Sequence, residues 1–432
     1  MSEARSPAAR PPLMSLDDAM QRLMARATPL GRTERVSTFD ADGRVLAQDV
    51  VSELQVPPND NSSMDGYAVR TADVTRPGTA LPVSQRIAAG HAGGPLTAGT
   101  AARIFTGAPM PEGADAVVMQ EDTTALDDGA RVRIDQVPAQ GQWVRAAGED
   151  VRRGATVLQK GERLAPASIG LAAGIGLAKL DVAARPRVAL FSTGDELVMP
   201  GDVPPADMKP GTIYNSNRFF LRALLLRLGC EVTDRGIVPD DRAATLEALQ
   251  SAATAHDLIL TSGGVSVGEE DHIKPAVEQL GQLDLWQIAM KPGKPFAYGS
   301  MASPKASDQQ DAGASAGPGV CHFMGLPGNP VSSFVTFLLL VRPFLLRLQG
   351  ATDTALPALS MRADFATTRP DKRREFLRAR RNTEGGLDLF ANQSSGVLTS
   401  AHWADGLIDL PAGQTIARGD LVRFIPLREL LA

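Results

Sequence analysis

Leu258–Gly268 reads LILTSGGVSVG and decides the fold of the central part of the chain. Its apolar start is typical of a buried strand, and the Ser-Gly-Gly turn leads toward a helix that we predict to begin near Glu270. In open α/β sheets, ligands bind at the carboxyl ends of the strands, where glycines let backbone N–H groups approach an anion. We therefore predict an oxyanion site at Ser262, Gly263 and Gly264. An isolated Gly-Gly pair is more often only a tight turn, and this alternative stays open.

The segments on either side alternate between strand and helix patterns. The predicted order is a strand at Val188–Phe191, a helix at Arg218–Leu228, a strand at Glu231–Val238, a helix at Arg242–Ala255 and the strand at Leu258–Thr261. This βαβαβ order is expected of a parallel sheet with helices on both faces. Further along, Phe334–Leu346 is strongly apolar, but Arg342 and Pro343 interrupt it, and it is shorter than the ~20 residues that a membrane span needs. We predict a buried core helix there.

Changes of pattern divide the rest of the chain into domains around this centre. We predict an α/β multidomain fold, in which β-rich accessory domains accompany a central α/β domain with a parallel sheet. The predicted domains are a disordered tail at 1–14, a discontinuous linking domain at 15–56 with 145–182, a small β-rich domain at 57–144, the α/β domain at 183–349 and a C-terminal β-rich domain at 350–432. Leu16–Met24 has helical spacing behind Ser15, which we expect to cap the helix. The low-complexity stretch Ser303–Gly319 is expected to be a flexible surface loop.

Composition argues against several classes of function. The 432 residues carry a formal net charge of −5 and only 5% aromatic residues, which is unlike a nucleic-acid-binding protein. Cys230 and Cys321 have no CxxC spacing and the histidines form no HExxH pattern, so neither a disulfide framework nor a zinc site is predicted. Residues 1–12 lack the apolar segment of a signal peptide. We expect a cytoplasmic protein that binds neither nucleic acid nor a membrane.

Acidic residues follow several of the predicted strands. They are Asp195 with Glu196, Asp240 with Asp241, and Glu269, Glu270 and Asp271. Carboxylates gathered at one edge of a sheet repel one another unless a hard cation lies among them, and Mg²⁺ is commonly held by one or two carboxylates together with phosphate oxygens. Acids at the first turn of a helix are also stabilised by the helix dipole, and this reading is equally good for any one of them.

Two proline- and glycine-rich turns flank the end of the α/β pattern. Lys291-Pro-Gly-Lys294-Pro holds two cations on a stiff turn that cannot be helical, which suits a multiply charged anion, although two surface lysines are often only solvated. Gly325-Leu-Pro-Gly-Asn-Pro330 precedes the buried helix, and we expect Asn329 or Ser332 to cap it.

Two further polar turns lie outside the α/β pattern. Asp60–Tyr67 reads DNSSMDGY, and Gly148-Glu-Asp150 is a second acidic turn. Asn, Asp, Ser and Gly are the residues that any turn uses, so composition alone indicates loops. No Ser–His–Asp order is recognisable in the chain.

Eight motifs taken in order resemble one family. They are DNSSMDGYAVR (60–70), IFTGAPMP (104–111), GEDV (148–151), STGDEL (192–197), YNSN (214–217), TSGGVSVGEED (261–271), MKPGKPFAYG (290–299) and GLPGNPVS (325–332). Together they closely resemble the molybdopterin molybdenumtransferase family, which includes the E domain of gephyrin. The similarity runs from about residue 15 to 430.

This resemblance implies a reaction, an assembly and a set of site residues. The reaction inserts molybdate into adenylated molybdopterin and releases AMP with the help of Mg²⁺. The implied assembly is a homodimer whose active site lies between the α/β domain of one subunit and the small β domain of the other, with molybdopterin adenylyltransferase as the upstream partner. The implied functional residues are Asp60, Thr106, Asp150, Glu196, Asp240, Asp271, Lys291 and Lys294, with Ser262, Gly263, Gly264, Pro327, Arg373 and Ser395 binding substrate, and with Glu196, Asp240 and Asp271 as Mg²⁺ ligands.

The sequence departs from the family pattern at two points. Gln287 stands where some relatives have a lysine after the tryptophan, so one cationic contact is missing or supplied elsewhere, and Ser303–Gly319 is longer than the pattern needs. Two other functions remain open. One is the adenylyltransferase, which resembles the α/β domain and does not need DNSSMDGYAVR. The other is a non-catalytic, peptide-binding scaffold related to gephyrin, against which the intact carboxylates and lysines argue.

Overall fold

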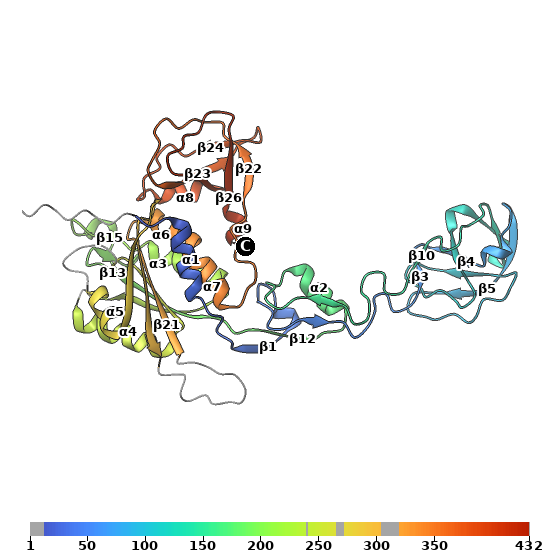
Figure 1. Cartoon of the computed structure of the whole chain (residues 1–432). Helices are drawn as coiled ribbons and strands as arrows, with labels where there is room; N and C mark the ends of the chain where they lie inside the picture. Colours follow the sequence, from blue (N-terminus) through green and yellow to red (C-terminus); the bar gives the residue numbers. More distant parts are fainter. Residues whose placement is uncertain (1–12, 239–240, 265–271, 304–318, 432) are drawn as a thin grey trace, which may run out of the picture.

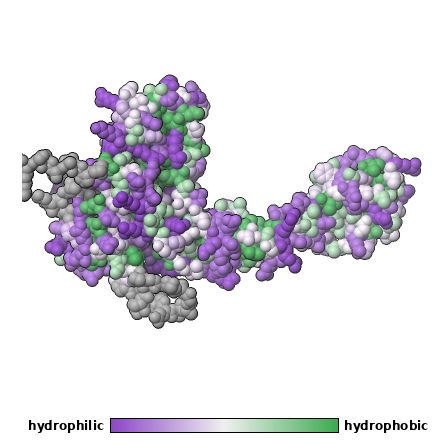
Figure 2. Space-filling model, viewed as in Figure 1, coloured by the Kyte–Doolittle hydropathy of each residue, from purple (hydrophilic) through white to green (hydrophobic). Residues whose placement is uncertain are grey.

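The computed structural model of the protein describes residues 13–238, 241–264, 272–303 and 319–431. Figure 1 shows a body, formed by the α/β domain and the C-terminal domain, and an arm that carries the small β domain at its far end. Polar residues cover much of the visible surface of both parts (Figure 2).

The central sheet of the body has the strand order β16-β13-β17-β21-β20-β18. Its strands are β13 (Arg187–Thr193), β16 (Glu231–Val238), β17 (Leu258–Ser262), β18 (Gly281–Gln287), β20 (Pro295–Ser303) and β21 (Gly319–Leu326). The four strands from β16 to β21 are parallel. β20 pairs antiparallel with β21, and β18 pairs antiparallel with β20, so β20 alone runs opposite to the other strands of this sheet. The predicted α/β fold class is confirmed, and the sheet is mixed because β20 and β21 form a hairpin. The Ser303–Gly319 prediction falls on residues 304–318, outside the described part.

Helices cover both faces of this sheet, as predicted. One face carries α1 (Leu16–Arg26), α3 (Asn217–Arg227), α6 (Pro330–Thr336), a π-helical turn (Phe337–Val341) and α7 (Arg342–Leu348), and the other carries α4 (Arg242–Ala255) and α5 (Ile273–Leu280). The alternation of side chains along a strand explains this division: Val188 and Leu190 of β13 join the first core, and Ala189 and Phe191 join the second. The helix that we predicted near Glu270 is α5, and Glu270 itself lies outside the described residues.

The apolar helix Pro330–Leu348 lies in the core of the body. It is 19 residues long and apolar enough to cross a membrane, but 89% of its apolar window is buried inside the protein. That is the arrangement of a core helix, as the sequence predicted. The predicted cap is different: Asn329 occupies the N-cap position but its side chain makes no capping hydrogen bond, and Ser332 lies inside α6. Pro330 at the first helical position has no amide to satisfy, and the Val331 amide that a cap would bind donates instead to the Ser395 carbonyl at 2.9 Å.

Helix α1 also belongs to this core, although we assigned residues 15–56 to the linking domain. Leu16, Ala19 and Leu23 are buried against the apolar helix, because their spacing places them on one face. The Ser15 hydroxyl accepts a hydrogen bond from the Asp18 amide at 3.0 Å, as predicted for a cap. The chain therefore contributes to the body before it enters the arm.

The arm begins with two strand pairs that bring distant segments together. β1 (Thr33–Ser37) pairs with β12 (Lys179–Ala183), and β2 (Val50–Val51) pairs with β11 (Thr156–Leu158), beside helix α2 (Pro166–Gly174). Both pairs are antiparallel, so the segment after residue 145 returns to the first one, as expected.

The two accessory domains are sheets. The small β domain has the order β7-β4-β6-β5-β9-β8, and the C-terminal sheet has the order β19-β23-β25-β26-β22 with β24 paired to β23. The small domain contains β3 (Asn61–Ser62), β4 (Gly66–Val69), β5 (Thr79–Ile87), β6 (Ala101–Ile104), β7 (Ala116–Met119), β8 (Thr123–Leu126), β9 (Arg131–Ile134) and β10 (Val144–Arg145). The C-terminal domain contains β22 (Leu359–Arg362), β23 (Arg374–Arg381), β24 (Leu387–Leu389), α8 (Leu398–Trp403), β25 (Gly406–Leu410), β26 (Leu421–Pro426) and α9 (Leu427–Leu431), and takes β19 (Met290–Lys291) from the α/β segment.

Candidate active site

Three parallel strands end side by side at one edge of the central sheet. Ser192 near the end of β13 is in register with Ser262 at the end of β17, and Ser262 is in register with Leu326 at the end of β21. The loops that follow these strands carry the STGDEL, TSGG and GLPGNP motifs. The sheet therefore brings three of the eight motifs to the edge where α/β proteins bind ligands.

The Gly263-Gly264 turn is packed too closely for any other residue. Both glycines have left-handed backbone angles (φ 97° and 68°), and a Cβ on Gly263 would lie 2.8 Å from the carbonyl oxygen of Thr193. The Gly263 amide donates to the Leu326 carbonyl at 3.0 Å, so it ties β17 to β21 and does not face a ligand. The described part of this turn thus supports the tight-turn reading for Gly263, and Val265–Asp271 lie outside the described residues.

A buried asparagine joins two of the loops. The Asn217 side-chain amide donates to the Ser262 hydroxyl at 2.8 Å and to the Gly328 carbonyl at 2.7 Å, and it places Ser262 next to the GLPGNP loop that contains Pro327. This role of Asn217 could not be predicted from the YNSN motif, because local spacing does not reveal a hydrogen bond between residues 111 positions apart.

Several buried polar atoms at this edge have no partner among the described residues. They are Ser192 Oγ, Thr193 Oγ1 and Asn215 Nδ2, all close to the strand ends. Buried polar groups without a partner are rare in native proteins and commonly mark a place where a ligand or water binds. The edge therefore has hydrogen-bonding capacity that the described protein groups do not use.

The carboxylates predicted to bind Mg²⁺ are only partly visible. Glu196 folds back over Gly194, where an added Cβ would lie 2.2 Å from its carboxylate oxygen. Asp240 and Asp271 lie outside the described residues. No group of three or more His, Cys, Asp or Glu that is suited to a metal occurs within the described ranges. A single carboxylate beside orphaned hydroxyls fits a Mg²⁺ that takes most of its other ligands from water and phosphate.

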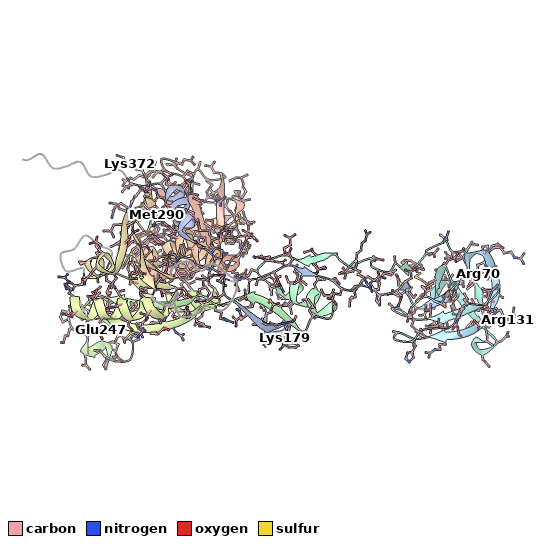
Figure 3. All side chains as sticks on the ribbon, turned by 60° about the horizontal axis from the view of Figure 1, so that its bottom comes forward. Arg70, Arg131, Lys179, Glu247, Met290 and Lys372 are labelled. Atoms are coloured by element: carbon pink, nitrogen blue, oxygen red, sulfur yellow. The ribbon has the colours of Figure 1, made fainter. Side chains whose placement is uncertain are left out.

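The two lysines of the KPGKP turn have different surroundings. Lys291 Nζ lies 2.8 Å from Glu375 Oε1 and 3.2 Å from Asp371 Oδ2, and Arg373 forms a bidentate pair with Asp371. The hydrogen bond with Glu375 raises the pKa of Lys291, and the Arg373 guanidinium holds the pKa of Asp371 well below its usual range. These pairs follow from β19 lying parallel to β23, and Figure 3 shows Met290 and Lys372 at this end of the body.

Lys294 has no ion pair with any carboxylate of the described segments. Its turn is held by Gly293, where a Cβ would lie 2.4 Å from Thr336 Oγ1 of α6. On the other side, the Ser395 carbonyl accepts from the Val331 amide in the first turn of α6 at 2.9 Å. The structure therefore brings Lys294, Ser395 and the GLPGNP loop to the start of the same helix, while Lys291 is neutralised by two carboxylates.

The remaining predicted residues lie together in the arm. Asp60 accepts from the Ala147 amide at 2.8 Å, and Asp150 donates its amide to the Val56 carbonyl, so both flank the chain crossing into the small domain. Thr106 donates its amide and its hydroxyl to Asp65 at 2.8 and 2.7 Å, which lowers the pKa of Asp65. Asp65 was not predicted. Figure 1 shows β3 and β10, which border this group, where the arm enters the small β domain and well away from the body, so a single chain does not unite the two halves of the predicted site.

The fold and the site define a class of protein. Residues 14–176 match the MoeA N-terminal region (domain I and II), residues 189–347 match the probable molybdopterin binding domain, and residues 360–427 match the MoeA C-terminal region (domain IV). These three families cover nearly the whole chain in the order that the structure shows.

The chain belongs to the MoeA family of molybdenum cofactor biosynthesis. It is 40% identical to the molybdopterin molybdenumtransferase of Haemophilus influenzae over 78% of each chain, and 37% identical to molybdopterin molybdenumtransferase 2 of Mycobacterium tuberculosis over 90% of this chain and 94% of that protein. A crystal structure of the molybdopterin biosynthesis moeA protein from Pyrococcus horikoshii superposes with a TM-score of 0.81 at 27% identity, over 96% of this chain and 100% of that one.

Proposed function

We propose that this protein is a transferase that inserts molybdate into adenylated molybdopterin and releases AMP. The observation that supports this most directly is the edge where the ends of β13, β17 and β21 meet Lys294 and Ser395. In the reaction, the two dithiolene sulfurs displace oxygen from molybdate, which leaves as water, and a water molecule cleaves the pyrophosphate bond that joins the adenylate to the molybdopterin phosphate. The named relatives are molybdopterin molybdenumtransferases, and we extend that activity to this chain.

The cationic residues of the site have two different roles in this proposal, anion binding and positioning. Molybdate is a dianion that must approach an anionic pyrophosphate, and the repulsion between them is worth several kcal/mol at low effective dielectric. Lys294, which has no described carboxylate partner, screens this repulsion and contacts the oxyanion. Lys291 and Arg373 are already paired with Asp371, so we assign them chiefly to holding the C-terminal domain against the turn.

Mg²⁺ would be held at this edge by Glu196, and the family resemblance implies Asp240 and Asp271, which lie outside the described residues, as further ligands. When bound, it withdraws charge from the pyrophosphate and stabilises the departing phosphate oxygen. Ser262 orients the substrate phosphate, and Asn217 fixes the Ser262 hydroxyl through its 2.8 Å hydrogen bond.

The arm residues act on the active site of a second subunit in this proposal. Asp60, Thr106 and Asp150 lie around the point where the chain crosses into the small β domain, away from the body. We therefore propose a homodimer in which each arm completes the partner's site. The protein works in the cytoplasm and receives its substrate from molybdopterin adenylyltransferase.

AMP release from adenylated molybdopterin, with Mg²⁺ and with or without molybdate, tests the proposal. We expect AMP release that depends on molybdate, and dithiolene-bound molybdenum as the product. The matched variants are Lys294→Ala and Lys179→Ala, since Lys179 is an exposed lysine on the arm (Figure 3). Only the first should raise the molybdate concentration needed for half-maximal rate. A folded dimer that releases no AMP would instead support the scaffold, and adenylation of molybdopterin from ATP would support the adenylyltransferase.

A further inference from the structure

The chain crosses between body and arm twice, and both crossings meet one buried carboxylate. The first crossing leads through Arg32 into β1, and the second leads from β12 through Pro186 into β13 at Arg187. Figure 1 shows β1 and β12 leaving the body side by side. Asp257, which directly precedes β17, lies between them although it is 225 residues from Arg32 in sequence.

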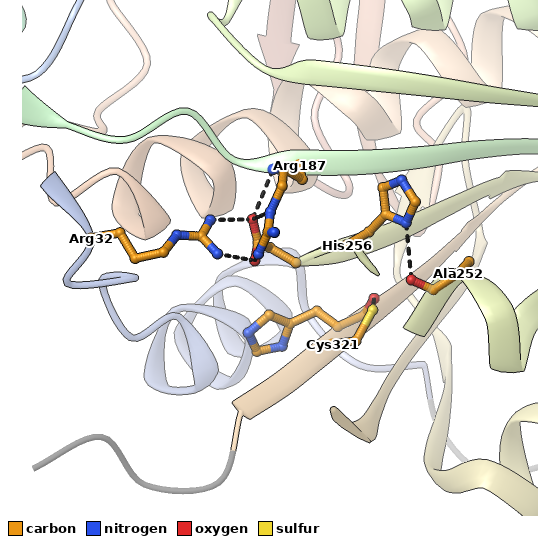
Figure 4. Close-up of polar contacts among 7 residues, drawn as sticks. Arg32, Arg187, Ala252, His256 and Cys321 are labelled. Atoms are coloured by element: carbon orange, nitrogen blue, oxygen red, sulfur yellow. Dashed lines mark hydrogen bonds and ion pairs between the residues drawn. The ribbon is translucent and has the colours of Figure 1, made fainter. Parts of the chain in front are cut away.

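Asp257 is bound from both sides (Figure 4). The Arg32 guanidinium donates to both of its carboxylate oxygens, at 3.0 and 2.6 Å, in a bidentate pair. Arg187 donates through its amide at 2.8 Å and through its guanidinium at 3.1 Å. Burial by itself would raise the pKa of Asp257, but the hydrogen bonds from Arg32 and Arg187 outweigh it, so the pKa is lowered and the carboxylate stays charged.

We propose that Asp257 and Arg32 form a clasp that sets the direction of the arm and so positions its active-site residues on the partner subunit. This inference rests on the proposed cross-subunit site. Arg32 is a positioning residue in it and touches no substrate.

The geometry favours a positioning role over a purely stabilising one. The Asp257 side chain is 8% exposed and remains paired with Arg187 whether or not Arg32 is present, whereas the Arg32 side chain is 36% exposed. Because Arg187 keeps the buried Asp257 paired, loss of the partly exposed Arg32 leaves no bare buried charge, and it should cost little stability. The bidentate shape of the Arg32 pair nevertheless fixes the orientation of the first crossing, and a small rotation at that point moves the far end of the arm by much more.

Other contacts also join the arm to the body, and the contribution of the clasp is what it adds to them. The Leu30 amide donates to the Leu348 carbonyl at 2.9 Å, and the Thr352 amide donates to the Gly161 carbonyl at 3.0 Å. Val45 of the linking segment also packs in the core of the body, and Arg163 donates to the Arg227 carbonyl at 3.3 Å. These contacts attach the arm to the body. The bidentate pair at Asp257 adds a planar, directional constraint at the first crossing itself.

The experiment uses a heterodimer with one working site. One subunit carries Asp60→Ala and so has a disabled arm. The other carries Lys294→Glu, which reverses the charge proposed to bind the oxyanion and so disables its edge. Two affinity tags isolate the mixed dimer. The working site then combines the edge of the first subunit with the arm of the second. Arg32→Gln is added to either subunit, and Arg35→Gln serves as the control, because Arg35 pairs with Asp181 inside the arm.

We expect AMP release to fall only when Arg32→Gln is on the subunit that supplies the working arm. The fall should lie between roughly fivefold and 100-fold, since a misplacement of about 1 Å at a catalytic group costs up to about 100-fold. Arg32→Lys, which keeps the charge but not the bidentate shape, should restore the rate in part. Arg35→Gln should leave the rate unchanged on either subunit.

Two outcomes overturn the clasp. Equal effects of Arg32→Gln on either subunit would show a structural role, and no effect on either would show no role. An inactive parent heterodimer would contradict the cross-subunit site and not the clasp. Small-angle scattering then tests the clasp by itself: we expect a broader distribution of maximum dimensions for the Arg32→Gln homodimer than for wild type. A scattering profile identical to wild type refutes the clasp.

Discussion

Replacing Asn217 by alanine should loosen the edge of the α/β domain on which the site is built. The substitution removes two hydrogen bonds, of 2.8 and 2.7 Å, and leaves the Gly328 carbonyl and the Ser262 hydroxyl in a buried place without their donor. Each unsatisfied buried group costs about 1–3 kcal/mol, so we expect a loss of about 3 kcal/mol in the free energy of unfolding. For a domain of this size that corresponds to a fall in Tm of roughly 6–12 °C.

Urea unfolding followed by circular dichroism and calorimetry of the same samples measures this loss. The matched control is Asn215→Ala, because Asn215 is equally buried but accepts only one hydrogen bond, from the Arg218 amide at 3.2 Å. We expect that variant to lose only about 1 kcal/mol. The reasoning is refuted if Asn217→Ala unfolds within the error of wild type, or if both variants lose the same amount.

Four further substitutions test the site and its support. Lys294→Ala should raise the KM for molybdate roughly tenfold at unchanged Tm, whereas Lys291→Ala should lower the Tm of the C-terminal domain slightly; the reverse pattern would assign the anion to Lys291. Burial lowers the pKa of His322 to about 4, whereas the same histidine in the unfolded state takes up a proton below about pH 6.5. The free energy of unfolding should therefore fall by roughly 3 kcal/mol as the pH falls from 6.5 to 4. His322→Phe should make the free energy of unfolding less dependent on pH over this range. Gly263→Ala should unfold at least about 2 kcal/mol more easily, because its Cβ meets the Thr193 carbonyl at 2.8 Å, and unaltered stability would show that the turn can shift.

The elements that sequence alone predicted well are those whose pattern is local. The helix Arg242–Ala255 and the strand Glu231–Val238 have the predicted bounds, because an apolar periodicity and a flanking cap or glycine determine them. The buried helix near Phe334 was also recognisable, since its residues are apolar on nearly every side and it has no continuous polar face. The predicted site residues of the arm came only from the resemblance to one family, because composition alone indicated no more than turns at these positions.

What the sequence could not reveal depends on contacts between distant segments. The bridge made by Asn217 and the pairing of Lys291 with Glu375 join residues far apart in sequence, so no spacing signals them. The placement of α1 with the body was missed for the same reason: an amphipathic helix shows that one face is buried but not against which domain. Lys291 and Lys294 looked equivalent in the turn, and only the parallel pairing of β19 with β23 distinguishes them.

The small β domain is an insertion whose two ends are neighbours. The chain enters it beside Asn61 and leaves it beside Arg145, and these two residues are paired in an antiparallel ladder. Insertions whose ends lie close together leave the host fold undisturbed, which is why circular permutation and domain grafting succeed at such points. Residues 57–144 can therefore diverge, or be exchanged as a cassette with those of a relative, without a compensating change in the body. In the proposed dimer, the surface that one subunit presents to the other can thus evolve separately from the edge of the α/β domain that would receive it.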